Sequence, residues 1–247
     1  MDLLFLIILG GLWGSFANVC IVRMPKDKGV VSGRSNCPKC KKQISWKDNI
    51  PIISYFLLGG KCRKCKKPIS FRYVVVELLS IISFVLIYYL FALSWTTLLL
   101  IILSLGFIII FFIDLEHFII PNLVTFPLIA IGFLKSFIPD LDPIFPNYVM
   151  SLIGGIFGYG IIWAIIFFYK QVKNKEGMGL GDAKLLAVIG FWFGLDATPF
   201  IIFLSSTIAL ISVTPDLIKK SKKMSSQIPF GPYILSLIHI SEPTRQH

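Results

Sequence analysis

Two aspartates stand beside long apolar runs of the sequence. Asp114 ends one run in FFIDLEHFIIPN (111–122), and Asp182 begins another after the glycines of GMGLGDAK (177–184). A carboxylate in or beside a membrane span is energetically costly, so such a residue marks a functional site by default. Two carboxylates held close together share a proton, and such a pair can activate a water as a base and protonate a leaving amine as an acid. The sequence therefore predicts that Asp114 and Asp182 form one acid–base pair.

Asp182 also has a purely structural interpretation. It directly precedes the apolar stretch 183–194 and would be a plain N-cap if a helix began there. The alternating glycines before it favour the active-site interpretation, because glycine lets a backbone bend or approach another chain and a cap needs no such run. Pro121, a helix breaker, similarly follows Asp114 in the sequence. Each aspartate is thus flanked by backbone that can line a wet cavity.

Four cysteines form two CxxC pairs, CPKC (37–40) and CRKC (62–65), with the 21 residues 41–61 between them. Zinc prefers four soft ligands in a tetrahedron, and this spacing lies at the long edge of the zinc-ribbon range. Two disulfides are the alternative, but the segment is strongly basic, which predicts a cytoplasmic location where thiols stay reduced. We predict a structural Zn²⁺ held by Cys37, Cys40, Cys62 and Cys65, whereas Cys20 lies in an apolar run and is expected only to pack.

The composition is that of a membrane protein. Of the 247 residues, 55% are hydrophobic, and the mean hydropathy is +0.80. The apolar runs predict eight helices, two of them short, so the expected fold class is an all-α polytopic membrane protein with a small zinc-ribbon-like insertion between helices one and two. The six longer runs are 3–22, 73–93, 95–113, 123–138, 148–169 and 197–213, and the two short ones are 184–195 and 228–240.

The net charge of +11 is concentrated in three loops. Most of it lies between Arg23 and Arg72, with further lysine clusters at 170–175 and 219–223. Basic loops stay cytoplasmic, which places the N-terminus outside and both aspartates at the cytoplasmic ends of their helices. Because topology and attraction to anionic headgroups explain the charge, we expect no nucleic-acid partner. HExxH, GxSxG, Walker and GxGxxG motifs are all missing from the sequence, which excludes the corresponding metalloprotease, serine-hydrolase and nucleotide-binding sites.

Seven motifs, in order, resemble the bacterial type IV prepilin leader peptidases, a family of GxGD-type intramembrane aspartic proteases. The resemblance runs from about Gly11 to Tyr233. The motifs are GSFANVCIVRMP (14–25), CPKC, ISWKDNIPIISY (44–55), CRKC with ISFRYVVVELLS (69–80), IDLEHFIIPN (113–122), GMGLGDAKLLAVIG (177–190) and PFGPY (229–233).

This resemblance implies an enzyme of the inner membrane that cuts the basic leader of prepilins or pseudopilins after a glycine, at the cytoplasmic face. It also implies N-methylation of the new N-terminal residue with S-adenosylmethionine, at a site that the sequence does not identify. Asp114 and Asp182 match the family's catalytic pair, and the four cysteines match its metal ligands. Glu77, inside the second span, either pairs with a basic residue or supports methyl transfer, and Lys184 either snorkels or tunes the aspartates.

The resemblance and the charge pattern together predict four segments: a first helix (1–23), a zinc-binding loop domain (24–72), a peptidase domain (73–235) and a truncated or artefactual tail (236–247). Three other functions remain open. The chain could be a peptidase without methylation, a proton-coupled transporter, or a zinc-ribbon scaffold with idle aspartates. Against a transporter, both aspartates are expected at one face, and the sequence has no repeated halves.

Overall fold

The computed structural model describes residues 2–31, 34–138, 141, 144–173, 179–203, 205 and 207. The chain divides into two compact units, Met1–Ile109 and Ile110–His247, and the division falls inside helix α4 (Trp95–His117). Across the described residues the regular structure is helical, apart from two isolated β-bridges. The expectation of an all-helical chain is therefore confirmed.

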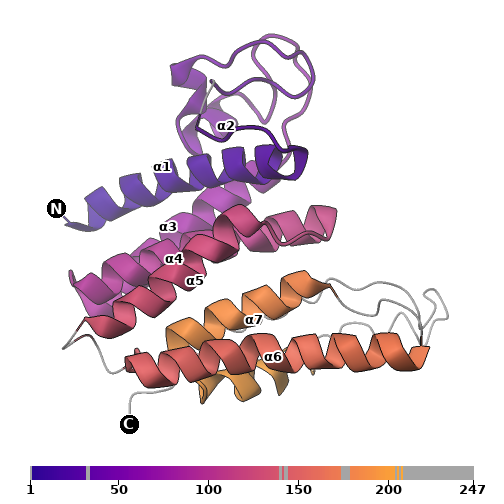
Figure 1. Ribbon diagram of the computed structural model, residues 1–247. Coiled ribbons are helices and arrows are strands. Elements are labelled where there is room, and N and C mark those ends of the chain that lie inside the picture. Colours follow the sequence, from indigo (N-terminus) through magenta and orange to yellow (C-terminus); the bar gives the residue numbers. More distant parts are fainter. Residues whose placement is uncertain are drawn as a thin grey trace. The chain divides into compact units, whose positions relative to one another are not determined.

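Two long helices, α1 (Asp2–Arg23) and α3 (Arg72–Phe91), pack side by side in the first unit (Figure 1). Glycines of α1 make this approach possible. A Cβ on Gly14 would lie 2.8 Å from the Cα of Glu77, and one on Gly10 would lie 2.9 Å from a backbone atom of α3. Small residues at helix crossings are typical of membrane proteins, where close van der Waals packing drives association.

The segment between α1 and α3 forms short elements, and among its described residues only Cys37 and Ser54 are buried. The elements are the 3-10 helices η1 (Met24–Lys26) and η2 (Trp46–Asn49), the helix α2 (Ile53–Leu57), and the bridges Asn36–Gln43 and Lys61–Pro68. Each bridge closes a loop around one CxxC pair. The backbone N–H of Cys37 donates to Lys42 O, and that of Cys62 donates to Lys67 O, both at 3.0 Å. The two cysteine pairs thus sit on equivalent turns.

The second unit begins with the last turns of α4 and continues through three further helices. These are α5 (Asn122–Leu134), which the 3-10 helix η3 (Lys135–Phe137) extends, α6 (Tyr148–Lys173) and α7 (Leu180–Phe193). Residues 197–203 are helical again. Helix α5 starts directly after Pro121, which fits the preference of proline for helix starts and ends.

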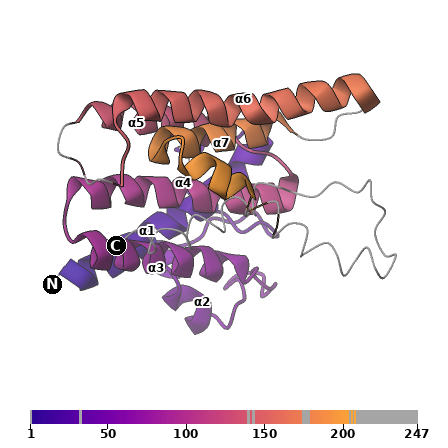
Figure 2. The same cartoon turned by 90° about the horizontal axis from the view of Figure 1, so that it is seen from below.

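Helix α7 packs along α6 and also contacts α5 (Figure 2). Its last turn is fixed by two hydrogen bonds. The indole N–H of the fully buried Trp192 donates to Leu128 O at 2.8 Å, and the hydroxyl of Ser151 donates to Phe191 O at 2.7 Å. These bonds hold the end of α7 against α5 and α6.

Four helices are long and apolar enough to cross a membrane, and they correspond to four of the predicted spans. They cover Asp2–Lys26, Arg72–Phe91, Trp95–His117 and Tyr148–Val172. The chain is therefore a multi-pass membrane protein. The runs predicted at 123–138 and 184–195 are also helices, but α5 with η3 and the 14-residue α7 are shorter than a normal span.

The total of eight spans is not confirmed. The run 228–240 and most of the run 197–213 lie outside the described residues, as do the PFGPY motif and the tail 236–247. The predicted domain boundaries remain predictions.

Candidate functional site

The structure brings the two aspartates together within the second unit. Asp114 lies in the last turn of α4 and is 5% exposed. Asp182 lies in the first turn of α7, and the negative charges of the two carboxylates repel each other across the space between them. Because neighbouring like charges do not both ionise easily, this arrangement favours a state in which one of the two carboxylates holds a proton.

The N-cap interpretation of Asp182 is wrong. Helix α7 begins at Leu180, its N-cap is Gly179 in an extended conformation, and Asp182 is the third helical residue. The backbone N–H of Asp182 donates to Gly179 O at 3.2 Å, which closes the first turn. The helix therefore starts earlier than the apolar pattern suggested, and its positive N-terminal end lies beside the Asp182 carboxylate.

Steric crowding explains why the residue before Asp182 is a glycine. A Cβ on Gly181 would lie 3.0 Å from the Cβ of Ile120, in the segment that joins α4 to α5. A larger residue would push the start of α7 away from this segment, and hence away from the end of α4 that carries Asp114. The earlier glycine of the motif, Gly177, lies outside the described residues.

The structure gives Lys184 a hydrogen-bond partner in another helix. Its Nζ donates to Asn122 Oδ1 at 2.7 Å and lies 5.4 Å from the centroid of the Phe126 ring. Lys184 thus joins the start of α7 to the start of α5 beside the aspartate pair. Asn122 was not predicted as a site residue, although its place directly after the helix-breaking Pro121 was a usable signal.

The four cysteines of the two CxxC pairs form one cluster in the first unit. Their Sγ atoms all lie within 4.8 Å of one another, and the Sγ atoms of Cys37 and Cys65 are 3.9 Å apart. A zinc tetrahedron with Zn–S bonds of 2.3 Å needs sulfurs about 3.8 Å apart, so the cluster fits Zn²⁺. All five cysteines of the chain are free, which excludes the disulfide alternative in this structure. Cys20 is buried and packs in α1, as expected.

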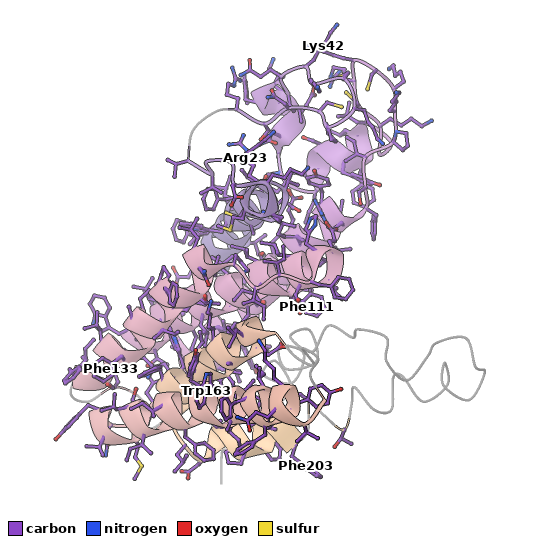
Figure 3. All side chains as sticks on the ribbon, turned by 45° about the vertical axis from the view of Figure 1, so that its right-hand side comes forward. Arg23, Lys42, Phe111, Phe133, Trp163 and Phe203 are labelled. Atoms are coloured by element: carbon purple, nitrogen blue, oxygen red, sulfur yellow. The ribbon has the colours of Figure 1, made fainter. Side chains whose placement is uncertain are left out.

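The backbone around the cluster favours a thiolate. Hydrogen bonds from the backbone N–H groups of Cys65 and Lys64 lower the pKa of Cys62 to about 6. The N–H of Lys67 also lowers the pKa of Cys65, but desolvation and the neighbouring thiols outweigh it and raise that pKa to about 11. The sulfurs therefore share hydrogen bonds in which one thiolate accepts, and a metal ion would replace the shared protons. Figure 3 shows sulfur atoms of this segment near the labelled Lys42.

Glu77 is buried in the first unit at 7% exposure. Its Oε2 accepts a hydrogen bond of 2.7 Å from the backbone N–H of Ile52, and the Ser15 hydroxyl also interacts with its carboxylate. Glu77 lines a cavity of about 480 Å³ between α1, α3 and the cysteine-containing segment. Asn18, which the sequence analysis left without a role, lines the same cavity and donates to Tyr73 O at 3.0 Å.

Two models of known protein families match this sequence. Residues 8–91 match a family described as the bacterial Peptidase A24 N-terminal domain, and residues 99–214 match the type IV leader peptidase family. No solved structure gives a significant match.

Several curated relatives are similar over nearly their whole length. A protein of Pseudomonas aeruginosa is 33% identical over 92% of this chain and 85% of its own, and one of Neisseria gonorrhoeae is 36% identical over 91% and 84%. A protein of Vibrio cholerae is 36% identical over 95% of both chains. All three carry the name prepilin leader peptidase/N-methyltransferase.

Proposed function

The chain belongs to the type IV leader peptidase family, and on this premise we propose that it removes the basic leader of type IV prepilins or pseudopilins and N-methylates the new N-terminus. The observation that carries the peptidase half is the pair formed by Asp114 and Asp182. These carboxylates come from different helices of one unit, and their charges repel each other. The methylation half rests on the names of the relatives.

The proposed chemistry follows from a shared proton. The ionised carboxylate takes a proton from a water, which attacks the carbonyl carbon of the leader's last glycine. The protonated carboxylate donates to the nitrogen of the leaving amine as the C–N bond breaks. The bonds of Trp192 and Ser151 position α7, and so hold Asp182 in place for both transfers.

The site is proposed to face the cytoplasm. Asp182 lies at the start of α7, shortly after Lys170, Lys173 and Lys175 in the sequence, and basic loops remain on the cytoplasmic side. Asp114, at the end of α4, belongs to the same proposed site. A prepilin has a basic leader followed by an apolar helix, so its cleavage site would reach the membrane surface at this level. The proposed setting is the bacterial inner membrane.

The four-cysteine cluster is proposed to hold a structural Zn²⁺. The sulfur separations fit a closed tetrahedral site with no open position for a substrate, which is typical of structural zinc. The surrounding segment has short helices and two isolated bridges, so the metal would supply much of its folding energy.

Mass spectrometry of a prepilin co-expressed with this chain tests the proposal. We expect a mature product that begins directly after the leader glycine and carries one extra CH₂. Asp114→Asn and Asp182→Asn should each leave the prepilin uncut, because each removes one member of the acid–base pair while preserving side-chain shape.

Asp196→Asn is the matched control, since Asp196 is an exposed aspartate past the other end of α7. It should process the prepilin normally. Cleavage that persists in either Asp114→Asn or Asp182→Asn would contradict the two-aspartate mechanism. Cleavage without the added CH₂ would leave the peptidase proposal intact and remove the methylation.

A further inference from the structure

The cavity beside Glu77 has the features of a site for a small charged ligand. Its volume of about 480 Å³ lies within the usual range of small-molecule pockets. The buried carboxylate of Glu77 lies at its wall, and Tyr55 adds an aromatic side chain. The exposed cationic side chains of Arg34, Lys42 and Lys64 also line it. The cavity therefore offers negative charge at a buried position and positive charge at exposed positions.

A second feature of the wall is an unpartnered acceptor. Asn18 is 2% exposed, and its amide nitrogen donates to the carbonyl oxygens of Tyr73 and Gly14. Its Oδ1 is buried and accepts no hydrogen bond from any residue that the structure describes. Buried polar atoms normally find a partner, and one that does not is a candidate for binding a ligand or a water.

The backbone at Ile52, which also lines the cavity, is strained. Ile52 has φ +61° and ψ −53°, and the N–H of Ile53 donates to Pro51 O at 2.6 Å, which closes a three-residue turn. A β-branched residue rarely adopts positive φ, so the surrounding structure must enforce it. Glu77 holds the Ile52 N–H at 2.7 Å and thereby supports the turn. Backbone strain of this kind gathers at ligand-binding sites.

We propose that this cavity binds the methyl donor, S-adenosylmethionine, with Glu77 facing the positively charged sulfonium. The proposal deepens the methylation half of the proposed function and rests on it. A sulfonium is a cation without hydrogen-bond donors, so a buried carboxylate and an aromatic wall suit it. The exposed basic side chains suit the carboxylate at the donor's amino-acid end.

Methyl transfer from the sulfonium to the new N-terminal amine needs no further reactant. The lone pair of the new N-terminal amine forms the N–C bond, and the electrons of the broken C–S bond stay on sulfur. The proton lost from nitrogen passes to water. Glu77 binds and orients the cation in this scheme, and the cavity walls exclude water from the sulfonium.

Donor binding to the full chain in lipid nanodiscs tests the proposal directly. Equilibrium dialysis would measure the Kd of radiolabelled S-adenosylmethionine and of S-adenosylhomocysteine, which lacks the sulfonium charge. Glu77→Gln keeps an amide oxygen that can accept from the Ile52 N–H but removes the charge. We expect it to weaken S-adenosylmethionine binding roughly tenfold or more, with little change for S-adenosylhomocysteine.

Two further variants separate binding from folding. Ser83→Ala is the matched control, because Ser83 is buried on the same helix, donates only to Leu79 O, and does not line the cavity. It should bind both ligands normally. Val19→Trp would place a large side chain in the cavity from α1 and should weaken the binding of both ligands to a similar extent. Leader cleavage, which depends on the aspartates of the other unit, reports that each variant is folded.

The outcomes are distinct from those of the proposed function. Unchanged binding in both Glu77→Gln and Val19→Trp would overturn the cavity assignment. Equal weakening of the two ligands by Glu77→Gln would overturn the pairing of Glu77 with the sulfonium. An unmutated chain that cuts the leader but binds neither ligand would overturn this inference alone. An unmutated chain that binds S-adenosylmethionine but never cuts the leader would overturn only the proposed peptidase activity.

Discussion

The glycines of α6 allow α7 to pack at very short range, and Gly154 gives the sharpest test of this contact. A Cβ at Gly154 would lie 2.6 Å from Gly194 C and 2.7 Å from Gly190 O. Ordinary van der Waals contact begins at 3.4 Å, so in Gly154→Ala the helices would have to separate locally by roughly 0.8 Å. Both neighbours are backbone atoms, which cannot move away by changing rotamer.

Gly160 on the same helix is the matched control, because a Cβ there would have no atom of the described residues within 4 Å. Both alanine variants share the helix-propensity gain of about 1 kcal/mol, so their difference isolates the packing strain. Overpacking of this kind costs about 1–3 kcal/mol. For a chain of this size, each kcal/mol shifts the thermal midpoint by about 2–4 °C, so Gly154→Ala should unfold several degrees below Gly160→Ala.

The same displacement should reach the proposed active site, because α7 carries Asp182. Misplacement of a catalytic group by about 1 Å can cost on the order of 100-fold in rate. We expect Gly154→Ala to slow leader cleavage at least several-fold, whereas Gly160→Ala should cleave normally.

The assay pairs a thermal scan at fixed rate, since membrane proteins often unfold irreversibly, with a prepilin cleavage time course. Equal midpoints and equal cleavage rates for the two alanine variants would refute the reasoning. That result would mean that the close approach of α6 and α7 contributes nothing measurable to stability or to the position of Asp182.

Two further predictions concern the cysteine cluster and Lys184. Treatment with a chelator should make the segment 24–71 cleavable by trypsin at its many Lys and Arg residues, because the proposed metal would supply much of the folding energy of this segment. Gel analysis would measure the cleavage, and equal resistance before and after chelation would count against a structural metal. Lys184→Met keeps the side-chain length but loses the bond to Asn122, so we expect a loss of about 1–2 kcal/mol and slower cleavage. Asn122→Ala should have a similar effect, and the double variant should be little less stable than either single variant. If the two losses in stability were fully additive, the two residues would act separately.

Candidate site residues could be predicted from the sequence where a reactive residue type stands in a recognisable local motif. The two CxxC turns were predictable because each is a local motif, and only their meeting in one cluster needed the fold. The two aspartates stood out because a carboxylate beside an apolar run has few structural explanations. The start of α7 was placed too late because the glycines before Asp182 were interpreted as loop, whereas Gly179 caps the helix and Gly181 lies inside it.

The features that could not be predicted from the sequence depend on contacts between residues far apart in the chain. Nothing local forces a positive φ on Ile52, since a β-branched residue normally avoids that region; the hydrogen bond from its N–H to Glu77, 25 residues away, accompanies it. The bond between Lys184 and Asn122 spans 62 residues in the same way. The α6 sequence also does not reveal which of its glycines meet a neighbour, because Gly154 and Gly160 differ only in what packs against them.

The same packing device supports a carboxylate in each unit. In the first unit, Gly14 of α1 allows the backbone of α3 to approach at Glu77 itself. In the second unit, Gly154 and Gly158 of α6 allow the approach of α7, which carries Asp182. Apolar side chains give helices little preference for one partner inside a membrane, so close backbone contact at glycines supplies both the attraction and the register. Each carboxylate is therefore positioned by the residues that have no side chain, and substitution of those glycines should impair the sites without removing any group that contacts substrate or donor.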